Sequence, residues 1–536
     1  MACWAPRSAD SHDYLISAIV PFEDLSSHSK RDGPGIATIT IEASPGEFEP
    51  GSFVVGAFRS LKNVTLVPID LKAGNQVLPK ENVDVRVVKV WEQAGQGPRK
   101  TKPVKVGELL VKDDTAPFLD SYNAQGHYSA PNIPNILSVR TNIAPGESKQ
   151  FWVTVKVPQD TPPGDYQGGI HIESLDSGIR EVLGIQLKVL PIRLQEPHQD
   201  RIIYYRGSLD PARGGDFVGE DRFTKELKDI RDHGFTGVTL YDSQEQYVRR
   251  AVELTASAAF PGPIIFIEPN PTFLNIAKAY SIPALFYGVD EPNDPERIKA
   301  HLEKAARIRS GGGKIVVAIN RNWALRLADS KDLNDPLDAV NFALTPDFLQ
   351  WVQTVGPAKD RWRFAKSWYY WQIMMEKPGL HRLLSGFFLW RSRLDGIFPY
   401  VYQHLSPPYS PFDDFAPWVG DYRVHMVTYP SADGPIPTLQ WEALREGIDD
   451  LRYLTTLENL IEKARTSSLP EVAEAVTRAS ALLDDLAQKI VLTETRLGAD
   501  GVKDPIRGIG PREYSAWRKK VVENILNVQK VMKRGQ

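Results

Sequence analysis

Two adjacent carboxylates, Asp290 and Glu291, follow directly after the apolar run Leu285–Val289 and stand just before Pro292. The run predicts a strand buried on both faces, and Pro292 ends it because proline has no backbone N–H to donate. Successive strand residues point to opposite sides, but a bend at the end of the strand lets both carboxylates face one cleft. The alternative interpretation is a structural pair that binds backbone donors.

Carboxyl groups are the usual acid and base of glycosidic-bond hydrolysis, where two of them commonly flank the scissile bond. Neighbours in the chain cannot easily take up opposite sides of a sugar. They suit a substrate-assisted scheme, in which Glu291 protonates the leaving oxygen and the 2-acetamido group of the substrate attacks the anomeric carbon. Asp290 then orients the amide and stabilises the charge of the oxazolinium ion. We expect a raised pKa for Glu291, because the neighbouring Asp290 anion disfavours its charged form.

Glu268 ends the preceding predicted strand, in the segment Ile-Phe-Ile-Glu-Pro-Asn. It could bind sugar hydroxyls, or act with Glu291 as nucleophile and acid in a double-displacement reaction on a sugar without an acetamido group. The other interpretation is an acid that caps a loop.

Aromatic and basic residues stand at the ends of other predicted strands. Aromatic rings there could stack on a sugar face, and the phenol of Tyr370 could donate to an acetamido carbonyl, although such residues equally fill protein cores. His404, beside them, is better explained as structural. The candidate substrate-binding residues are Tyr205, Arg206, Tyr241, Glu268, Trp368, Tyr370, Tyr400 and Tyr402.

Strand-like and helix-like segments alternate eight times between about residues 201 and 402. This number and spacing predict a (β/α)₈ barrel, whose catalytic groups lie at the carboxyl ends of the strands. Asp290 and Glu291 end the fourth predicted strand. An open doubly wound sheet is the alternative, but no glycine fingerprint follows the first strand. Helices are expected over 223–233, 295–310, 346–355 and 380–394.

The segments on either side of the barrel have different patterns. Short alternating strands with Gly- and Pro-rich turns predict an antiparallel β-sandwich, and the last hundred residues predict amphipathic helices over 441–464, 469–491 and 513–533. A short strand is expected within 424–429. We therefore predict an irregular segment at 1–35, a β-sandwich at 36–195, the barrel at 196–437 and a helical region at 438–536.

Composition excludes several classes of protein. The formal net charge is −3 with no long basic run, so no nucleic-acid partner is expected. Cys3 is the only cysteine, which rules out intramolecular disulfides and thiolate metal sites. No metal or cofactor motif is present, and no apolar run is long enough for a membrane span. The N-terminus lacks a signal-peptide pattern, so we expect a cytoplasmic protein, or a secreted one if the chain has been trimmed. The oligomeric state is left open.

Three stretches resemble glycoside hydrolase family 123 and its wider relatives: Ala43-Ser-Pro-Gly-Glu-Phe-Glu-Pro with Phe53-Val-Val, Tyr287-Gly-Val-Asp-Glu-Pro, and the segment from Tyr429 to Leu454. The resemblance implies a β-sandwich followed by a (β/α)₈ barrel, and a β-N-acetylgalactosaminidase activity. It implies that Asp290 is the stabiliser, Glu291 the acid/base and Tyr370 a site tyrosine. The chain departs from the pattern at Tyr400, where relatives usually have Trp, and at Gln440, where they usually have Arg.

The sequence thus predicts a retaining glycoside hydrolase that acts, from chain ends or internally, on a glycan or glycoconjugate with a β-linked 2-acetamido sugar, GalNAc before GlcNAc. One alternative is a two-carboxylate glycosidase using Glu291 and Glu268. The other is a carbohydrate-binding protein that keeps the barrel without turnover.

Overall fold

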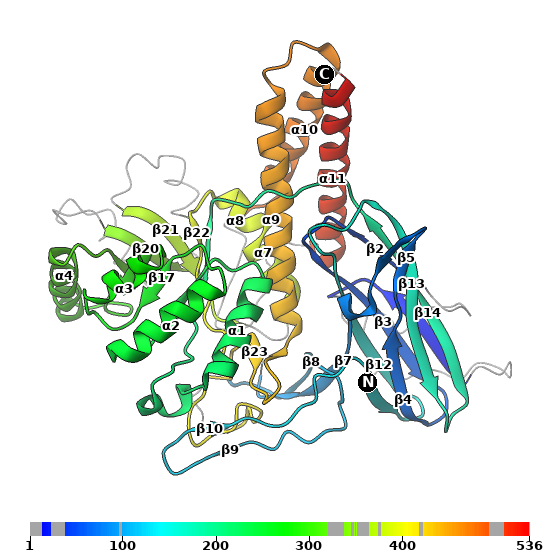
Figure 1. Ribbon diagram of the computed structural model, residues 1–536, viewed down its shortest axis with the longest axis horizontal. Coiled ribbons are helices and arrows are strands. Elements are labelled where there is room, and N and C mark those ends of the chain that lie inside the picture. Colours follow the sequence, from blue (N-terminus) through cyan, green and yellow to red (C-terminus); the bar gives the residue numbers. More distant parts are fainter. Residues whose placement is uncertain are drawn as a thin grey trace.

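The protein consists of a β-sandwich, a closed barrel and a long helical bundle (Figure 1). The computed structural model describes residues 13–22, 38–95, 99–319, 337–344, 348, 350, 364–373, 377–416, 422–492 and 509–534. Within these residues, the architecture predicted from the sequence is confirmed.

The β-sandwich packs two sheets face to face. The first has the strand order β1 (Tyr14–Ile19), β3 (Phe48–Ala57), β12 (Ser148–Lys156), β7 (Val83–Gln93) and β8 (Val104–Val111). The second has the order β11 (Val139–Ile143), β4 (Leu61–Pro68), β13 (Gly164–Ser174), β14 (Ile179–Val189) and β2 (Ile39–Ala43), with β5 (Leu71–Ala73) and β6 (Gln76–Leu78) at its side. Strands such as β2 and β11 alternate strictly between buried and exposed residues, as the sequence pattern requires. All pairings are antiparallel except that of β14 with β2.

The N-terminal segment differs from the irregular stretch predicted over 1–35. Residues 14–19 form β1, which pairs antiparallel with β3 over six residues of register, from Tyr14 opposite Ala57 to Ile19 opposite Ser52. The prediction was wrong here because Leu15-Ile-Ser-Ala-Ile is too short to stand out as a strand without the partner it pairs with.

Eight parallel strands close the barrel: β15 (Asp200–Ile203), β16 (Gly237–Leu240), β17 (Ile264–Phe266), β18 (Ala284–Tyr287), β19 (Ile315–Ile319), β20 (Leu337–Ala343), β21 (Phe364–Tyr370) and β22 (Gly396–Ile397). The described helices around it are α1 (Glu220–Asp232), α2 (Glu245–Ser257), α3 (Phe273–Ala279), α4 (Pro295–Ser310), α7 (Pro378–Ser385) and α8 (Phe387–Ser392). The helix expected over 346–355 lies outside the described residues except for 348 and 350.

The single helix predicted over 380–394 is instead two helices that meet at Gly386. A Cβ atom on Gly386 would lie only 2.4 Å from the carbonyl oxygen of Gly447 on the neighbouring helix. The two backbones therefore approach more closely than any larger residue allows, and the helix breaks at this contact.

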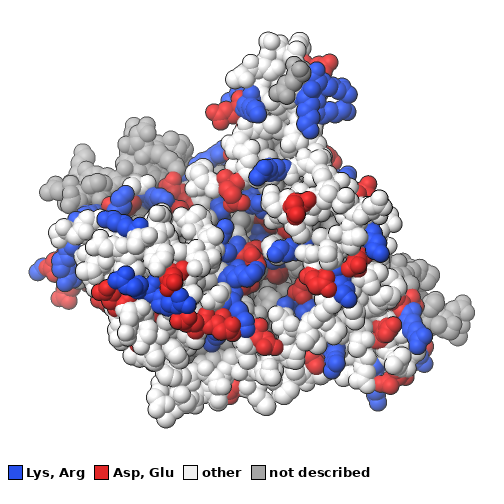
Figure 2. Space-filling view, in the orientation of Figure 1, with Lys and Arg blue, Asp and Glu red and all other residues white. Residues whose placement is uncertain are grey.

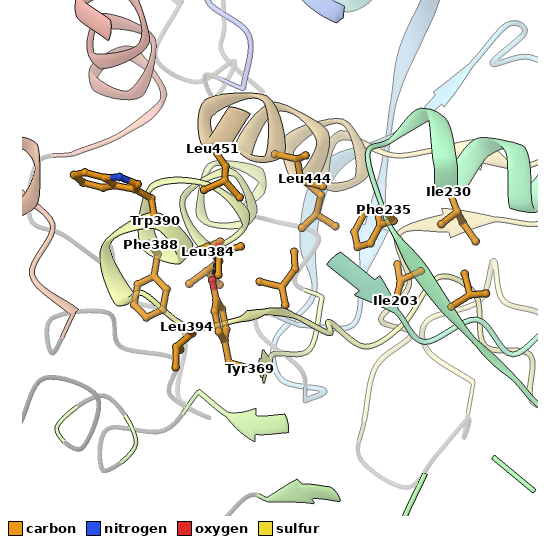
Figure 3. Packing of buried hydrophobic residues seen from close by; sticks show 14 of the residues in the cluster. Ile203, Ile230, Phe235, Tyr369, Leu384, Phe388, Trp390, Leu394, Leu444 and Leu451 are labelled. Atoms are coloured by element: carbon orange, nitrogen blue, oxygen red, sulfur yellow. Dashed lines mark hydrogen bonds between the residues drawn. The ribbon is translucent and has the colours of Figure 1, made fainter. Parts of the chain in front are cut away.

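The C-terminal region forms α9 (Leu439–Ala464), α10 (Pro470–Lys489) and α11 (Pro511–Arg534), which rise from the rest of the molecule in Figure 1. In Figure 3, Leu444 and Leu451 extend from α9 toward the barrel, where Leu384 and Tyr369 lie. Of the strand expected within 424–429, only Thr428–Tyr429 forms β23, paired with β24 (Ile436–Pro437).

Glu442, in the first turn of α9, connects the helical bundle to both the sandwich and the barrel. Its carboxylate accepts a hydrogen bond of 3.1 Å from the indole of Trp152 on β12 and lies 3.4 Å from Nε2 of His233 at the end of α1. Arg445, one turn along α9, pairs with the same carboxylate. The buried contact fixes the sandwich against the barrel.

Charges of both signs alternate over the barrel and sandwich in Figure 2, in keeping with the small net charge. Basic side chains gather at the tip of the helical bundle, where the last turn of α11 carries Lys533 and Arg534. Among the described helices, none combines the length and the apolar character that crossing a membrane requires.

Candidate active site

Asp290 and Glu291 lie just beyond β18, at the carboxyl end of the barrel strands. Asp290 is exposed and Glu291 is half-buried. Glu291 adopts a φ of 42°, in the left-handed region, so the chain turns sharply where the strand ends. An extended strand would send the two carboxylates to opposite sides, and this turn instead lets both of them reach tyrosines of the barrel interior.

The phenols of Tyr287 and Tyr204 form a chain of hydrogen bonds that ends at Asp290. The hydroxyl of Tyr287 donates to Oδ1 of Asp290 at 2.7 Å, and it lies 2.8 Å from the hydroxyl of Tyr204. The ring of Tyr204 stacks on Phe398 with centroids 4.0 Å apart, and the amide of Asn341 lies 3.4 Å from its hydroxyl. These contacts hold the Tyr287 phenol in position to donate to the carboxylate.

Five tyrosines lie close enough to Asp290 for its charge to affect their pKa values. Burial raises the pKa of each, and the negative charge of Asp290 raises it further, so all five remain protonated hydrogen-bond donors at neutral pH. They come from both sides of the barrel mouth and are Tyr204, Tyr241, Tyr287, Tyr370 and Tyr400.

Glu291 is paired with Tyr370, which ends β21. The phenol of Tyr370 donates a hydrogen bond to Oε1 of Glu291. Side chains from the carboxyl ends of β18 and β21 thus meet across the mouth of the barrel, and the structure brings Asp290, Glu291 and Tyr370 together there.

Tyr400 occupies the same mouth and is bordered by two histidines. Its hydroxyl lies 3.1 Å from Nδ1 of His404, and its ring centroid is 5.5 Å from that of His425. Burial, with the nearby positive charge of Arg206, lowers the pKa of His404 to about 2, so this histidine is neutral. A neutral ring at the rim agrees with a structural role for His404.

Arg206 and Tyr241 lie beside Tyr400 at the mouth, after the neighbouring strands β15 and β16. The guanidinium of Arg206 holds Asp216 through two hydrogen bonds, of 3.1 and 2.8 Å, and lies 5.1 Å above the ring of Tyr241. Arg213 lies 5.6 Å from the same ring and 3.4 Å from Asp216. The two arginines and one carboxylate leave a local positive charge beside the tyrosines.

Three of the predicted substrate-binding residues lie in the protein interior, so the prediction was wrong for them. The phenol of Tyr205 donates to Glu226 at 2.8 Å, and that of Tyr402 donates to Asp229 at 2.9 Å, both between the barrel and its helices. The indole of Trp368 donates to Asp200 at 3.1 Å, at the start of β15 and so at the opposite end of the barrel. All three side chains are fully buried by protein contacts, which leaves no surface for a sugar.

Glu268 is exposed and lies in the segment that follows β17. Its charge acts on Lys304, whose Nζ donates to the carbonyl of Gly288 at 3.2 Å. No described contact joins Glu268 to Glu291.

Sequence reasoning missed Tyr204 and Tyr287 as site residues. Their rings lie in the barrel interior, and the hydroxyl of Tyr204 contacts that of Tyr287, which donates to Asp290. The available signal was alternation: Tyr204 shares a strand face with Ile202, which lies inside the barrel, while Tyr205 shares one with Ile203, which packs under the helices.

The arrangement offers an acid beside a second carboxylate, protonated phenols as donors, and aromatic faces. Such a set can protonate a leaving oxygen, hold a polar group through hydrogen bonds and pack against an apolar sugar face.

Comparison with known proteins agrees with this architecture. Residues 38–174 match the model of the glycoside hydrolase 123 N-terminal domain. The fold is similar to that of a family 123 glycoside hydrolase from Clostridium perfringens, studied for glycolipid glycan hydrolysis, with 14% identity and a TM-score of 0.67. The match covers 97% of this chain and 99% of that one.

A β-glucuronidase from Parabacteroides merdae matches less well, with 10% identity and a TM-score of 0.31 over 77% of this chain and 54% of its own. A similarity this low carries no argument. The sequence matches no protein in the curated set. The chain is thus similar to the glycoside hydrolase 123 N-terminal domain over residues 38–174 and to a family 123 glycoside hydrolase in overall fold, and the resemblance predicted from its sequence is confirmed.

Proposed function

We propose that the protein is a retaining glycoside hydrolase that cleaves β-linked 2-acetamido sugars by substrate assistance, with GalNAc preferred over GlcNAc. The observation that carries the proposal is the pair of contacts at the barrel mouth, where Tyr287 donates to Asp290 and Tyr370 donates to Glu291. Two neighbouring carboxylates with separate phenol partners are suited to separate roles.

In this mechanism Glu291 gives its proton to the glycosidic oxygen as the bond to the anomeric carbon breaks. The acetamido carbonyl oxygen of the same sugar attacks that carbon from the opposite face and forms an oxazolinium ion. The carboxylate of Asp290 accepts a hydrogen bond from the acetamido N–H and stabilises the positive charge. Glu291 then removes a proton from water, which opens the ring and restores the original anomeric configuration.

Tyr287 holds the Asp290 carboxylate in position through its 2.7 Å hydrogen bond. Tyr370 donates to Glu291 in the free protein and could turn to the acetamido carbonyl when the sugar is bound. The ring of Tyr400 supplies an aromatic face at the mouth. Arg206 and Tyr241, beside it, are candidates for contacts with hydroxyl groups.

The preference for GalNAc comes from the resemblance to family 123 noted in the sequence. The Clostridium perfringens protein has been studied on glycolipid glycans, so oligosaccharides that end in β-linked GalNAc are the first substrates to try.

The experiment is calorimetric binding of a GalNAc-thiazoline, a stable mimic of the oxazolinium ion. We expect the wild type to bind it at least 100-fold more tightly than GalNAc itself, as a mimic of this kind binds more tightly than substrate. Asp290→Asn should lose most of this difference. Equal affinity for both compounds would reject substrate assistance.

A further inference from the structure

Helix α4 follows the carboxylate pair in the chain and presents three polar side chains to it. Arg297, His301 and Lys304 stand at positions i, i+4 and i+7 of this helix and therefore share one face. Each contacts the backbone of a different residue in the segment Gly288–Asp290. We call these three side chains the α4 stripe.

The three contacts fall on consecutive residues. Nζ of Lys304 donates to the carbonyl of Gly288 at 3.2 Å. The backbone N–H of Val289 donates to Nδ1 of His301 at 3.4 Å. The guanidinium of Arg297 donates to the carbonyl of Asp290. One helix face thus holds the whole segment that leads into the two carboxylates.

His301 is set up to accept rather than to donate. Because its Nδ1 receives the Val289 N–H, the ring proton lies on Nε2, which is buried without a hydrogen-bond partner among the described residues. Burial, with the positive charges of Lys304 and Arg309, lowers the pKa of His301 to about 4. The ring is neutral at neutral pH, as an acceptor must be.

Gly288 fits the same arrangement. A Cβ atom there would lie 2.5 Å from Nδ1 of His301 and 3.0 Å from the carbonyl oxygen of Val316, so only glycine lets the segment lie against the helix. The N–H of Gly288 donates to Val316 on β19 at 2.7 Å. The segment is held from the barrel on one side and from α4 on the other.

We infer that the α4 stripe positions the carboxylate pair for catalysis. The inference rests on the proposed function and extends it to residues that touch no substrate. Glu291 follows the held segment directly and turns through a positive φ, so the direction of its side chain depends on where Asp290 is fixed. A displacement of about 1 Å at a catalytic group can cost about 100-fold in rate.

The first test measures the backbone itself, without substrate. Hydrogen–deuterium exchange is followed in peptides covering 285–293 for the wild type, Arg297→Met, Lys304→Met and the control Lys299→Met. Lys299 lies on the same helix and is 80% exposed, and its partner is Glu303, away from the segment. We expect at least tenfold faster exchange in the first two variants and no change in the control. Unchanged exchange in both variants would overturn the inference.

The second test separates positioning from simple loss of stability. A good leaving group such as 4-nitrophenol needs little protonation, whereas an alkyl alcohol depends on the acid. We expect Arg297→Met and Lys304→Met to lower kcat about tenfold more on the alkyl glycoside than on the 4-nitrophenyl one, with similar KM. An equal loss on both substrates would contradict positioning of Glu291.

His301 allows a rescue within the same design. His301→Leu removes the acceptor, while His301→Asn places an amide oxygen near the position of Nδ1. We expect the Asn variant to recover protection of the Val289 amide and most of the activity, and the Leu variant to recover neither. Equal behaviour of the two would count against the hydrogen bond.

Glu268→Gln serves as a further control. If it behaved like Lys304→Met, Lys304 would act through Glu268 and not through the carbonyl of Gly288. Hydrogen–deuterium exchange can be measured without turnover. An inactive wild type would therefore reject the proposed function, and the exchange rates of the variants would still decide whether the α4 stripe holds the segment.

Discussion

The phenol of Tyr287 donates a 2.7 Å hydrogen bond to the carboxylate of Asp290, three residues further along the chain. We predict that Tyr287→Phe lowers kcat by about 10- to 100-fold, because a hydrogen bond to a charged group contributes about 1.5–3 kcal/mol. Steady-state kinetics on a β-GalNAc substrate checks this.

Tyr205→Phe is the matched control. Tyr205 also donates its phenol to a carboxylate, that of Glu226, but on the helix side of the barrel wall. This variant should lose thermal stability and keep kcat per folded molecule. If both variants lost activity to the same extent, the hydrogen bond to Asp290 would have no special role.

Asp290→Asn distinguishes the substrate-assisted mechanism from a classical one. An amide cannot balance the charge of an oxazolinium ion, so we expect kcat on acetamido sugars to fall about 100-fold or more. Comparable activity of this variant and the wild type on a β-GalNAc substrate would remove Asp290 from the mechanism.

Glu268 is the test of the two-carboxylate alternative. Glu268 is exposed and its described electrostatic partner is Lys304, and we predict that Glu268→Gln retains activity within about threefold, since most substitutions of exposed side chains have small effects. Loss of turnover with rescue of product formation by added azide would instead identify Glu268 as a nucleophile.

Stability should depend on pH through a buried carboxyl that joins the sandwich to α9. Glu47 accepts hydrogen bonds from the N–H of Ser44 and, at 2.6 Å, from the phenol of Tyr453. Burial, together with the charge of Asp449, raises the pKa of Glu47 to about 8 from its ordinary 4.5, although Arg518 and Arg452 oppose the rise. Between these two values the folded protein holds a proton that the unfolded chain has lost.

The stabilisation from this proton is therefore complete below about pH 4.5 and is lost as the pH rises toward 8. Relative to wild type, Glu47→Gln should gain stability by about 1 kcal/mol per pH unit across this window. Thermal unfolding from pH 4 to 9 measures it, with the exposed Glu173→Gln as control. A constant difference between variant and wild type at all pH values would show that Glu47 does not titrate in this way.

The barrel could be predicted from the sequence because each strand is a short apolar run and each helix has an apolar stripe. The position of Asp290 and Glu291 at the end of the fourth strand followed from the same pattern. Which tyrosine of a neighbouring pair enters the barrel did not. Tyr204 lies at the site and Tyr205 in the outer core, and the choice depends on the register of β15 against its neighbours, which the run Ile-Ile-Tyr-Tyr does not specify.

Other parts of the site depend on contacts between distant segments. Tyr400 and Tyr402 are two residues apart and would share one face of a regular strand, yet β22 ends at Ile397 and the chain beyond it sends Tyr402 toward Asp229 on α1. Trp368 points along the barrel toward Asp200, because the indole N–H needs a partner once it is buried. No local pattern carries this information.

The most direct measurement is release of 4-nitrophenol from its β-GalNAc, β-GlcNAc, β-galactoside and β-glucoside derivatives, by the wild type and by Glu291→Gln. The account predicts activity on the acetamido sugars alone, GalNAc first, and a fall of about 10²–10⁴-fold in the variant on an unactivated β-GalNAc glycoside measured in parallel. Turnover of the galactoside or glucoside at the rate of the acetamido sugars, or a fully active Glu291→Gln on the unactivated glycoside, would contradict it.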